Sequence, residues 1–207
     1  MAALSTGAAL VAYIVASLSL AVGLALAGVV IIVAVALVWR RAGTEERSLV
    51  GRTAIVGAIA GVVSTAAYDV AKLALSRLDP VAYDPFAVFF SFGLAIGGVA
   101  TSAPTAYTIG AIYHVFNGVA FGIGFAFLVG KRGIAAGVLY GLFLEAFMLA
   151  LFPGWLKVQA FEEFARVSAL SHVVYGALLG LICQRWLPGA LAARPHRQER
   201  QVTGGRT

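Results

Sequence analysis

Five long apolar runs set the strongest limit on how this chain can fold. They cover residues 9–39, 53–78, 105–129, 134–152 and 167–187. An α-helix needs about 20 apolar residues to cross the hydrocarbon core of a bilayer, and each run reaches or approaches that length. A backbone in lipid must also satisfy its own hydrogen bonds, which favours helices. The sequence therefore predicts an all-α, polytopic transmembrane helical bundle with five spanning helices.

The composition agrees with a lipid environment. Of 207 residues, 61% are hydrophobic and 12% are charged, which leaves too little polar surface for an ordinary water-soluble domain. Cys183 is the only cysteine, so the chain can form neither an internal disulfide nor a thiolate metal cage. No glycine-rich phosphate loop is present, and no nucleotide partner is expected. The lipid bilayer is the expected partner.

Positive charge is concentrated in three segments, and cytoplasmic loops are the ones that collect Lys and Arg. The rule places the N-terminus outside and the C-terminus in the cytoplasm of a multi-pass membrane protein. It also indicates that the basic tail, residues 188–207, faces water or lipid headgroups rather than nucleic acid. The basic residues are Arg40, Arg41, Arg47 and Arg52, then Lys131 and Arg132, then Arg185, Arg194, Arg197, Arg200 and Arg206.

Residues 1–52 are expected to form an N-terminal anchor helix and a basic cytoplasmic loop, and residues 53–187 a four-helix core. The first run is 31 residues long. As one straight helix it would extend about 46 Å, more than the roughly 30 Å hydrocarbon core, so we expect it to tilt or project. Residues 86–104 are predicted to be re-entrant or interfacial, because a sixth crossing would put Lys131 and Arg132 outside; a sixth helix is the alternative.

The core contains a repeat. Residues 57–69 and 133–145 both carry a small residue at every fourth position and end on an acid, Asp69 or Glu145. The runs that follow each begin a second pattern with a histidine, His114 or His172. The second and third spanning helices are therefore predicted to form one hairpin, and the fourth and fifth a second copy in parallel topology. The glycines expected to pack the helices closely are Gly57, Gly61, Gly118, Gly122, Gly133, Gly137, Gly141, Gly176 and Gly180.

The two acids and two histidines lie at similar depths along their helices, within roughly one helical turn. A pseudo-twofold axis along the membrane normal would bring them to one place. Ionisable groups within a membrane are costly and often mark ion or proton pathways. We therefore predict a site for a cation or protons, with a transport or sensing role and no catalytic residue. The candidate residues are Asp69, His114, Asn117, Glu145, His172 and Tyr175.

Other interpretations of these residues stay open. Asp69 has Lys72 one turn along its own helix, and a neutralised pair there could be purely structural. The histidines could be neutral and simply hydrogen-bond one helix to another. Two imidazoles and two carboxylates also suit a divalent metal, with His114, His172, Glu145 and Asp69 as ligands. Haem between the two histidines is less favoured, because the glycine faces leave little room.

Two further function classes follow from these alternatives. The chain could be an accessory or assembly subunit of a larger membrane complex, or form a homo-oligomer, since it is small and its glycine faces and long first helix could contact partners. A metal- or haem-binding component of a membrane oxidoreductase is the third class.

Several short motifs resemble a known family. They are "AIAGVVST" at 58–65, "YHVFNGVAFGIGFAFLVG" at 113–130, "LFPGW" at 151–155 and "SHVVYGALLG" at 171–180. Together they make roughly residues 53–187 resemble the YagU-like bacterial inner-membrane proteins. The resemblance implies a bacterial inner-membrane location. It implies no biochemical activity, because none is established for that family.

Overall fold

The computed structural model describes residues 4–78, 84–158 and 160–189. These residues form seven helices and no strand. Five helices, α2, α3, α5, α6 and α7, are long and apolar enough to cross a membrane, which confirms the predicted fold class. Most of the predicted basic tail lies outside the described residues. The helices are α1 (Ser5–Ala16), α2 (Leu20–Arg41), α3 (Thr44–Leu78), α4 (Ala87–Gly97), α5 (Ala103–Leu128), α6 (Gly133–Leu156) and α7 (Phe161–Trp186).

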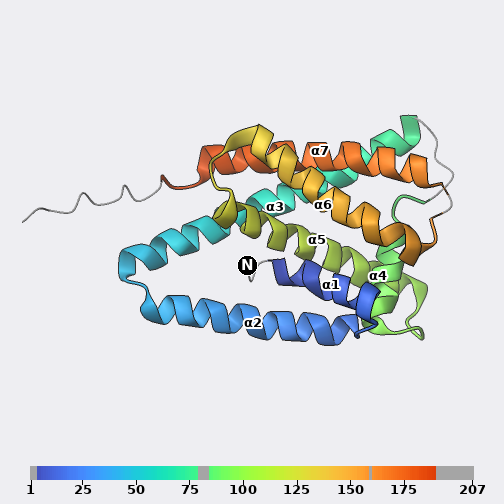
Figure 1. Ribbon diagram of the computed structural model, residues 1–207, viewed down its shortest axis with the longest axis horizontal. Coiled ribbons are helices and arrows are strands. Elements are labelled where there is room, and N and C mark those ends of the chain that lie inside the picture. Colours follow the sequence, from blue (N-terminus) through green and yellow to red (C-terminus); the bar gives the residue numbers. More distant parts are fainter. Residues whose placement is uncertain (1–3, 79–83, 159, 190–207) are drawn as a thin grey trace, which may run out of the picture.

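The prediction of one continuous helix over residues 9–39 is wrong. The chain turns at residues 17–19, where Ser17 takes the left-handed conformation with φ 55°. Ser19 then begins α2 as its N-cap residue. α1 folds back beside α2, with Ala9 packed against Gly23 (Figure 1). The excess length of the run is thereby explained, since α2 alone has 22 residues and extends about 33 Å.

α4 occupies the segment predicted to be re-entrant or interfacial. Its 11 residues extend about 16 Å, so α4 is not a sixth spanning helix. It packs tightly on α5, because Gly93 meets the backbone of Ala106 and Gly110 meets the carbonyl of Phe89. α4 lies at the same end of the bundle as the turn between α1 and α2 (Figure 1).

Glycines let the paired helices approach at backbone distance. A Cβ on Gly57 of α3 would lie 2.8 Å from Cα of Ile123 on α5. A Cβ on Gly137 of α6 would lie 2.8 Å from Cα of Gly180 on α7. Small residues favour such close packing in lipid, where apolar side chains gain little by leaving the acyl chains. The helices consequently associate as two hairpins, α3 with α5 and α6 with α7.

The two hairpins meet unequally. α3 packs along α7, whereas α5 and α6 touch chiefly through Tyr140, whose hydroxyl donates to the carbonyl of Phe121 at 3.1 Å. A twofold axis would make these two contacts equivalent. The interface between the hairpins is therefore built mainly from α3 and α7, and it buries the side chains of Ser64, Tyr68, Ser168 and Ser171.

Candidate functional site

Two histidine–carboxylate pairs lie in the bundle, one in each hairpin. In the first, Nε2 of His114 on α5 lies 3.1 Å from Oδ1 of Asp69 on α3. In the second, Nδ1 of His172 on α7 lies 2.7 Å from Oε2 of Glu145 on α6. The side chains of His114 and Asp69 are 20% and 28% exposed, whereas those of His172 and Glu145 are 13% and 4% exposed. The second pair is the shorter and the more deeply buried.

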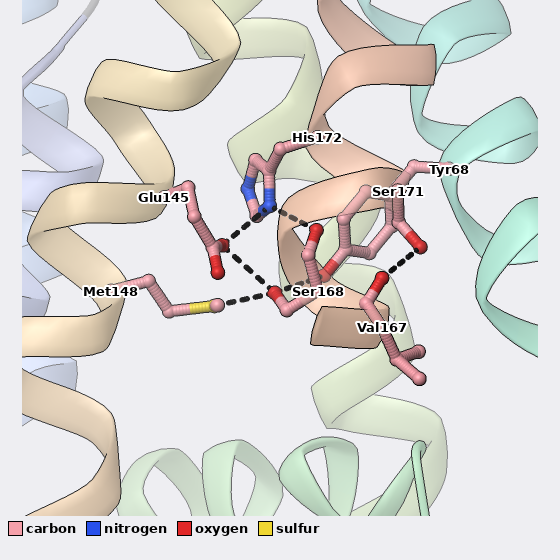
Figure 2. Close-up of polar contacts among 7 residues, drawn as sticks. All are labelled: Tyr68, Glu145, Met148, Val167, Ser168, Ser171 and His172. Carbon is pink, nitrogen blue, oxygen red and sulfur yellow. Dashed lines mark hydrogen bonds and ion pairs between the residues drawn. The ribbon is translucent and has the colours of Figure 1, made fainter. Parts of the chain in front are cut away.

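Hydrogen bonds fix the second pair in place (Figure 2). The Ser168 hydroxyl donates to Oε2 of Glu145 at 2.8 Å, and the Ser168 carbonyl lies 3.0 Å from Nδ1 of His172. A carbonyl oxygen can only accept a hydrogen bond, so Nδ1 carries the hydrogen. The remaining carboxylate oxygen, Oε1 of Glu145, is buried and has no hydrogen-bond partner.

Tyr68 of α3 contacts both histidines, although no pattern in the sequence marks it as a site residue. Its ring centroid lies 4.8 Å from that of His172 and 5.9 Å from that of His114. Its hydroxyl is 3.5 Å from the hydroxyl of Ser168. The residue that corresponds to Tyr68 in the second copy of the repeat is Leu144, so a search of the repeat could not find this contact.

Lys72 is buried beside the pairs, with 5% of its surface exposed. Its ammonium lies over the rings of Tyr68 and Phe86, at 5.6 Å and 5.4 Å from their centroids. It lies one turn along α3 from Asp69, the partner that the sequence suggests.

α4 covers the first pair from the side. The ring of Phe89 lies against the imidazole of His114, with centroids 4.9 Å apart, and Phe86 follows at 5.5 Å from Phe89. The short helix thus brings apolar rings onto His114. The ammonium of Lys72 lies over the Phe86 ring, so that contacts between side chains connect Lys72 to His114 by way of Phe86 and Phe89.

The other two predicted site residues make their polar contacts outside the two pairs. Oδ1 of Asn117 accepts a hydrogen bond from Thr6 of α1 at 2.7 Å. The Tyr175 hydroxyl donates to the carbonyl of Gly118 at 3.5 Å, while its ring centroid is 6.4 Å from that of His172. Asn117 and Tyr175 therefore do not form a polar shell around the histidines, because one binds α1 and the other reaches the backbone of α5.

The arrangement does not suit a metal ion or a haem. Within the ranges that the structure describes, no three His, Cys, Asp or Glu side chains come together as metal ligands. The four expected ligands form two separate pairs. Both imidazoles are also in contact with Tyr68, which takes up space that a cofactor between them would need.

These features define a multi-pass α-helical membrane protein with ionisable pairs between its helices. The chain belongs to the DUF6789 family, a family of unknown function, whose model matches residues 51–191. The match confirms the expected membership of an uncharacterised family but does not confirm the YagU-like resemblance. It begins within α3, after α1 and α2. No curated protein and no solved structure matches the chain.

Proposed function

We propose that this protein binds a proton or a small monovalent cation at its histidine–carboxylate pairs, in a transport or sensing role. The observation that carries the proposal is the buried pair of Glu145 and His172, held at 2.7 Å with a further hydrogen bond from Ser168. Protons can pass between groups of this kind because each can hold or release one.

The energetic cost of the site supports a function beyond helix packing. A charged side chain at the centre of a bilayer costs about 2.5 to 3.5 kcal/mol on insertion scales. The interfaces in this bundle are already closed by glycine contacts, for example between Gly137 and Gly180. Neutral hydrogen-bonding residues could join the helices at a lower cost. We therefore interpret the two acids, two histidines and one lysine as a working site.

We further propose a bacterial inner-membrane location with the C-terminus in the cytoplasm. Arg41 at the end of α2, Arg132 before α6 and Arg185 near the end of α7 lie at the same end of the bundle (Figure 1). The positive-inside rule makes that end cytoplasmic. Asp69 is nine residues before the opposite end of α3 at Leu78, so the site would lie about 13 Å from the outer end of that helix.

Proton uptake into proteoliposomes tests this function. Vesicles that enclose a pH-sensitive dye would contain the wild type, Glu145→Gln or Glu162→Gln. The external pH is then changed in one step while the membrane potential is clamped. Glu162 is exposed in the first turn of α7, so its variant is the matched control. We expect Glu145→Gln to reduce uptake at least tenfold while Glu162→Gln matches the wild type. Equal proton uptake by the wild type and both variants would reject a transport role, and so would an equal proton leak into vesicles without protein. If Glu145→Gln also bound protons as the wild type does, a sensing role would be rejected as well.

An accessory role in a membrane complex is the second candidate, and α2 is the observation that favours it. This helix contacts α1 and α4 but leaves much of its apolar surface uncovered. Lipid alone can cover such a surface, and so can a partner helix. Extraction in a mild detergent followed by native electrophoresis distinguishes the two. Stable co-migration with other subunits would favour this role, whereas a lone monomer or homodimer would count against it. The exposed residues include Val22, Leu26, Val29, Val30, Ile32, Val33, Val35 and Leu37.

A further inference from the structure

We propose that the end of α2 that carries Arg40 binds a phospholipid with a negatively charged headgroup. An acyl chain of the lipid lies in a shallow apolar groove on α2, and the phosphate meets Arg40 and Arg47. The structural basis is this groove together with a contact between an arginine and a tryptophan at its end. The proposal goes beyond the histidine–carboxylate pairs and does not depend on what they bind.

The groove follows one side of α2 and has the length of one membrane leaflet. Ile31 and Arg40 are nine residues apart, which corresponds to about 14 Å along a helix. One leaflet contributes about 15 Å to a hydrocarbon core of roughly 30 Å. An acyl chain from one leaflet can therefore lie along the whole groove. The groove is lined by Ile31, Ile32, Val35, Ala36, Trp39 and Arg40.

No helix among the described residues packs over this end of α2. α2 packs against α1 and α4. Both of these helices lie toward the end of the bundle that is opposite Arg41 (Figure 1). Val35 is 56% exposed and Trp39 is 46% exposed. The groove is therefore accessible to lipid.

Two arginines without an acidic partner lie where the groove ends. The guanidinium of Arg47, near the start of α3, lies over the Trp39 ring at 5.8 Å from its centroid. Nε of Arg47 is buried and has no hydrogen-bond partner. Arg40 follows Trp39 in α2, and across the described parts of the chain neither arginine forms an ion pair with a carboxylate. A guanidinium can bind a phosphate through two N–H groups at once.

The acidic residues nearby do not cancel this charge. Glu46 of α3 accepts a hydrogen bond from the backbone N–H of Gly43 at 3.0 Å. It lines a second groove on α2 together with Arg41, and its carboxylate makes that groove unsuitable for an anion. Basic pockets between transmembrane helices are typical binding sites for anionic headgroups. The end of α2 and the start of α3 carry four arginines, Arg40, Arg41, Arg47 and Arg52, against two acids, Glu45 and Glu46.

A phospholipid matches both parts of this surface at once. Tryptophan side chains concentrate at the boundary between hydrocarbon and headgroups, so Trp39 indicates that Arg40 and Arg47 lie at the depth of lipid phosphates. A partner helix would cover the apolar groove but would leave both arginines without an anion unless it carried an acid at that depth. A free phosphate ion would meet the arginines but would not occupy the groove. These considerations favour a lipid.

Quenching of Trp39 fluorescence by brominated lipids tests the proposal. The chain has three tryptophans, so Trp155→Phe combined with Trp186→Phe leaves Trp39 as the only one. The full-length protein is placed in mixed vesicles of phosphatidylglycerol and phosphatidylcholine, with bromine on the acyl chains of one lipid at a time. Bromine quenches a tryptophan only at close range, so the two measurements give the relative affinity of the lipids at Trp39. We expect phosphatidylglycerol to bind about fivefold more tightly or better.

Arginine variants of the same protein distinguish a defined site from general surface charge. Arg40→Gln and Arg47→Gln should each reduce the preference for phosphatidylglycerol by about twofold to fivefold. Arg185→Gln is the matched control and should keep the full preference, because it removes one charge from an exposed position on α7 at the same end of the bundle (Figure 1). Arg40→Lys keeps the charge and shows whether this position tolerates change.

Three results would overturn the proposal. The first is an equal affinity of the two lipids at Trp39. The second is an equal loss of preference in Arg185→Gln and in the Arg40 and Arg47 variants, because surface charge alone would then explain it. The third is a failure of both lipids to quench Trp39, because the groove would then be covered by protein, either a second copy of this chain or a partner helix.

Discussion

The ring of Tyr68 meets the imidazole of His172 nearly edge-on, with centroids 4.8 Å apart and an angle of 70° between the planes. The two residues belong to different hairpins, on α3 and α7. Tyr68 also touches His114 of its own hairpin. It is thus the side chain through which the two histidine–carboxylate pairs are in contact, and its hydroxyl leads to Glu145 by way of Ser168.

Removing only the hydroxyl of Tyr68 should affect proton exchange more than stability. Tyr68→Phe keeps the ring contacts with both histidines, and the lost hydrogen bond is a long one at 3.5 Å, so we expect a stability change below about 1 kcal/mol. Proton uptake in liposomes should slow several-fold if the hydroxyl passes protons between the pairs. Tyr68→Ala should lose stability as well. Wild-type uptake rates in Tyr68→Phe would show that the hydroxyl takes no part.

Ser168 and Ser171 offer a matched comparison of two fully buried serines on α7. The Ser168 hydroxyl binds Glu145 on another helix, whereas the Ser171 hydroxyl binds the carbonyl of Val167 on its own helix at 2.7 Å. Ser168→Ala leaves a buried carboxylate with one partner fewer, so we expect a loss of about 1 to 3 kcal/mol. Ser171→Ala should cost less. Thermal unfolding in detergent measures both, and an equal loss would mean that the bond to Glu145 adds nothing.

The glycine contacts predict a large effect from a single methyl group. A Cβ on Gly176 would lie 2.8 Å from Cα of Val138, against backbone that cannot move aside without separating α6 from α7. We expect Gly176→Ala to cost about 1 to 3 kcal/mol, the usual range for overpacking. Gly154→Ala is the control, because nothing lies within 4 Å of the added atom.

Thermal unfolding in detergent measures the effect of Gly176→Ala, which should also lengthen the 2.7 Å distance between His172 and Glu145 by moving α6 away from α7. A Gly176→Ala protein as stable as Gly154→Ala would contradict the close approach of the two helices.

The turn between α1 and α2 predicts opposite effects from two substitutions at Ser17. Its φ of 55° is in the left-handed region, which glycine adopts freely and β-branched residues strongly resist. Ser17→Gly should leave stability unchanged or raise it by up to about 1 kcal/mol, whereas Ser17→Val should lower it. Limited proteolysis at this turn and thermal unfolding measure the difference. Equal behaviour of the two variants would argue for a continuous helix through the turn.

The sequence could predict what depends on one helix or one hairpin at a time. Apolar run length predicts the five spanning helices, and the repeat predicts two hairpins that each supply one acid and one histidine. It could not give the relation between hairpins, which depends on which helix faces meet. The contact of Tyr68 with His172 crosses that interface, and Lys72 is buried beside it with its ammonium over the Tyr68 ring. Neither residue has a polar counterpart in the second copy, where Leu144 and Met148 stand.

Two other differences between the sequence predictions and the structure have local causes. The turn at Ser17 was hidden in an apolar run, because two serines on either side of Leu18 do little to lower its hydrophobic character. The sequence predicts both Asn117 and Tyr175 for the site, because they occupy matching positions one turn from the two histidines. In the structure α1 lies beside α5 and supplies the hydroxyl of Thr6 as the partner of Asn117. The partner of a side chain can lie on a helix outside the repeat, as α1 does. Comparing the two copies of the repeat cannot reveal such a partner.

The backbone contact of α6 with α7 restricts how the site can change its access to either side of the membrane. With Gly137, Gly176 and Gly180 against opposing backbone, the two helices have no clearance for sliding or rotation, and Glu145 and His172 must travel together. Between the hairpins, α3 and α7 meet through side chains such as those of Tyr68 and Ser168, and the remaining freedom of movement lies there. Alternating exposure of the pairs would therefore require one hairpin to rock as a rigid body against the other, with the Tyr68 ring as the pivot.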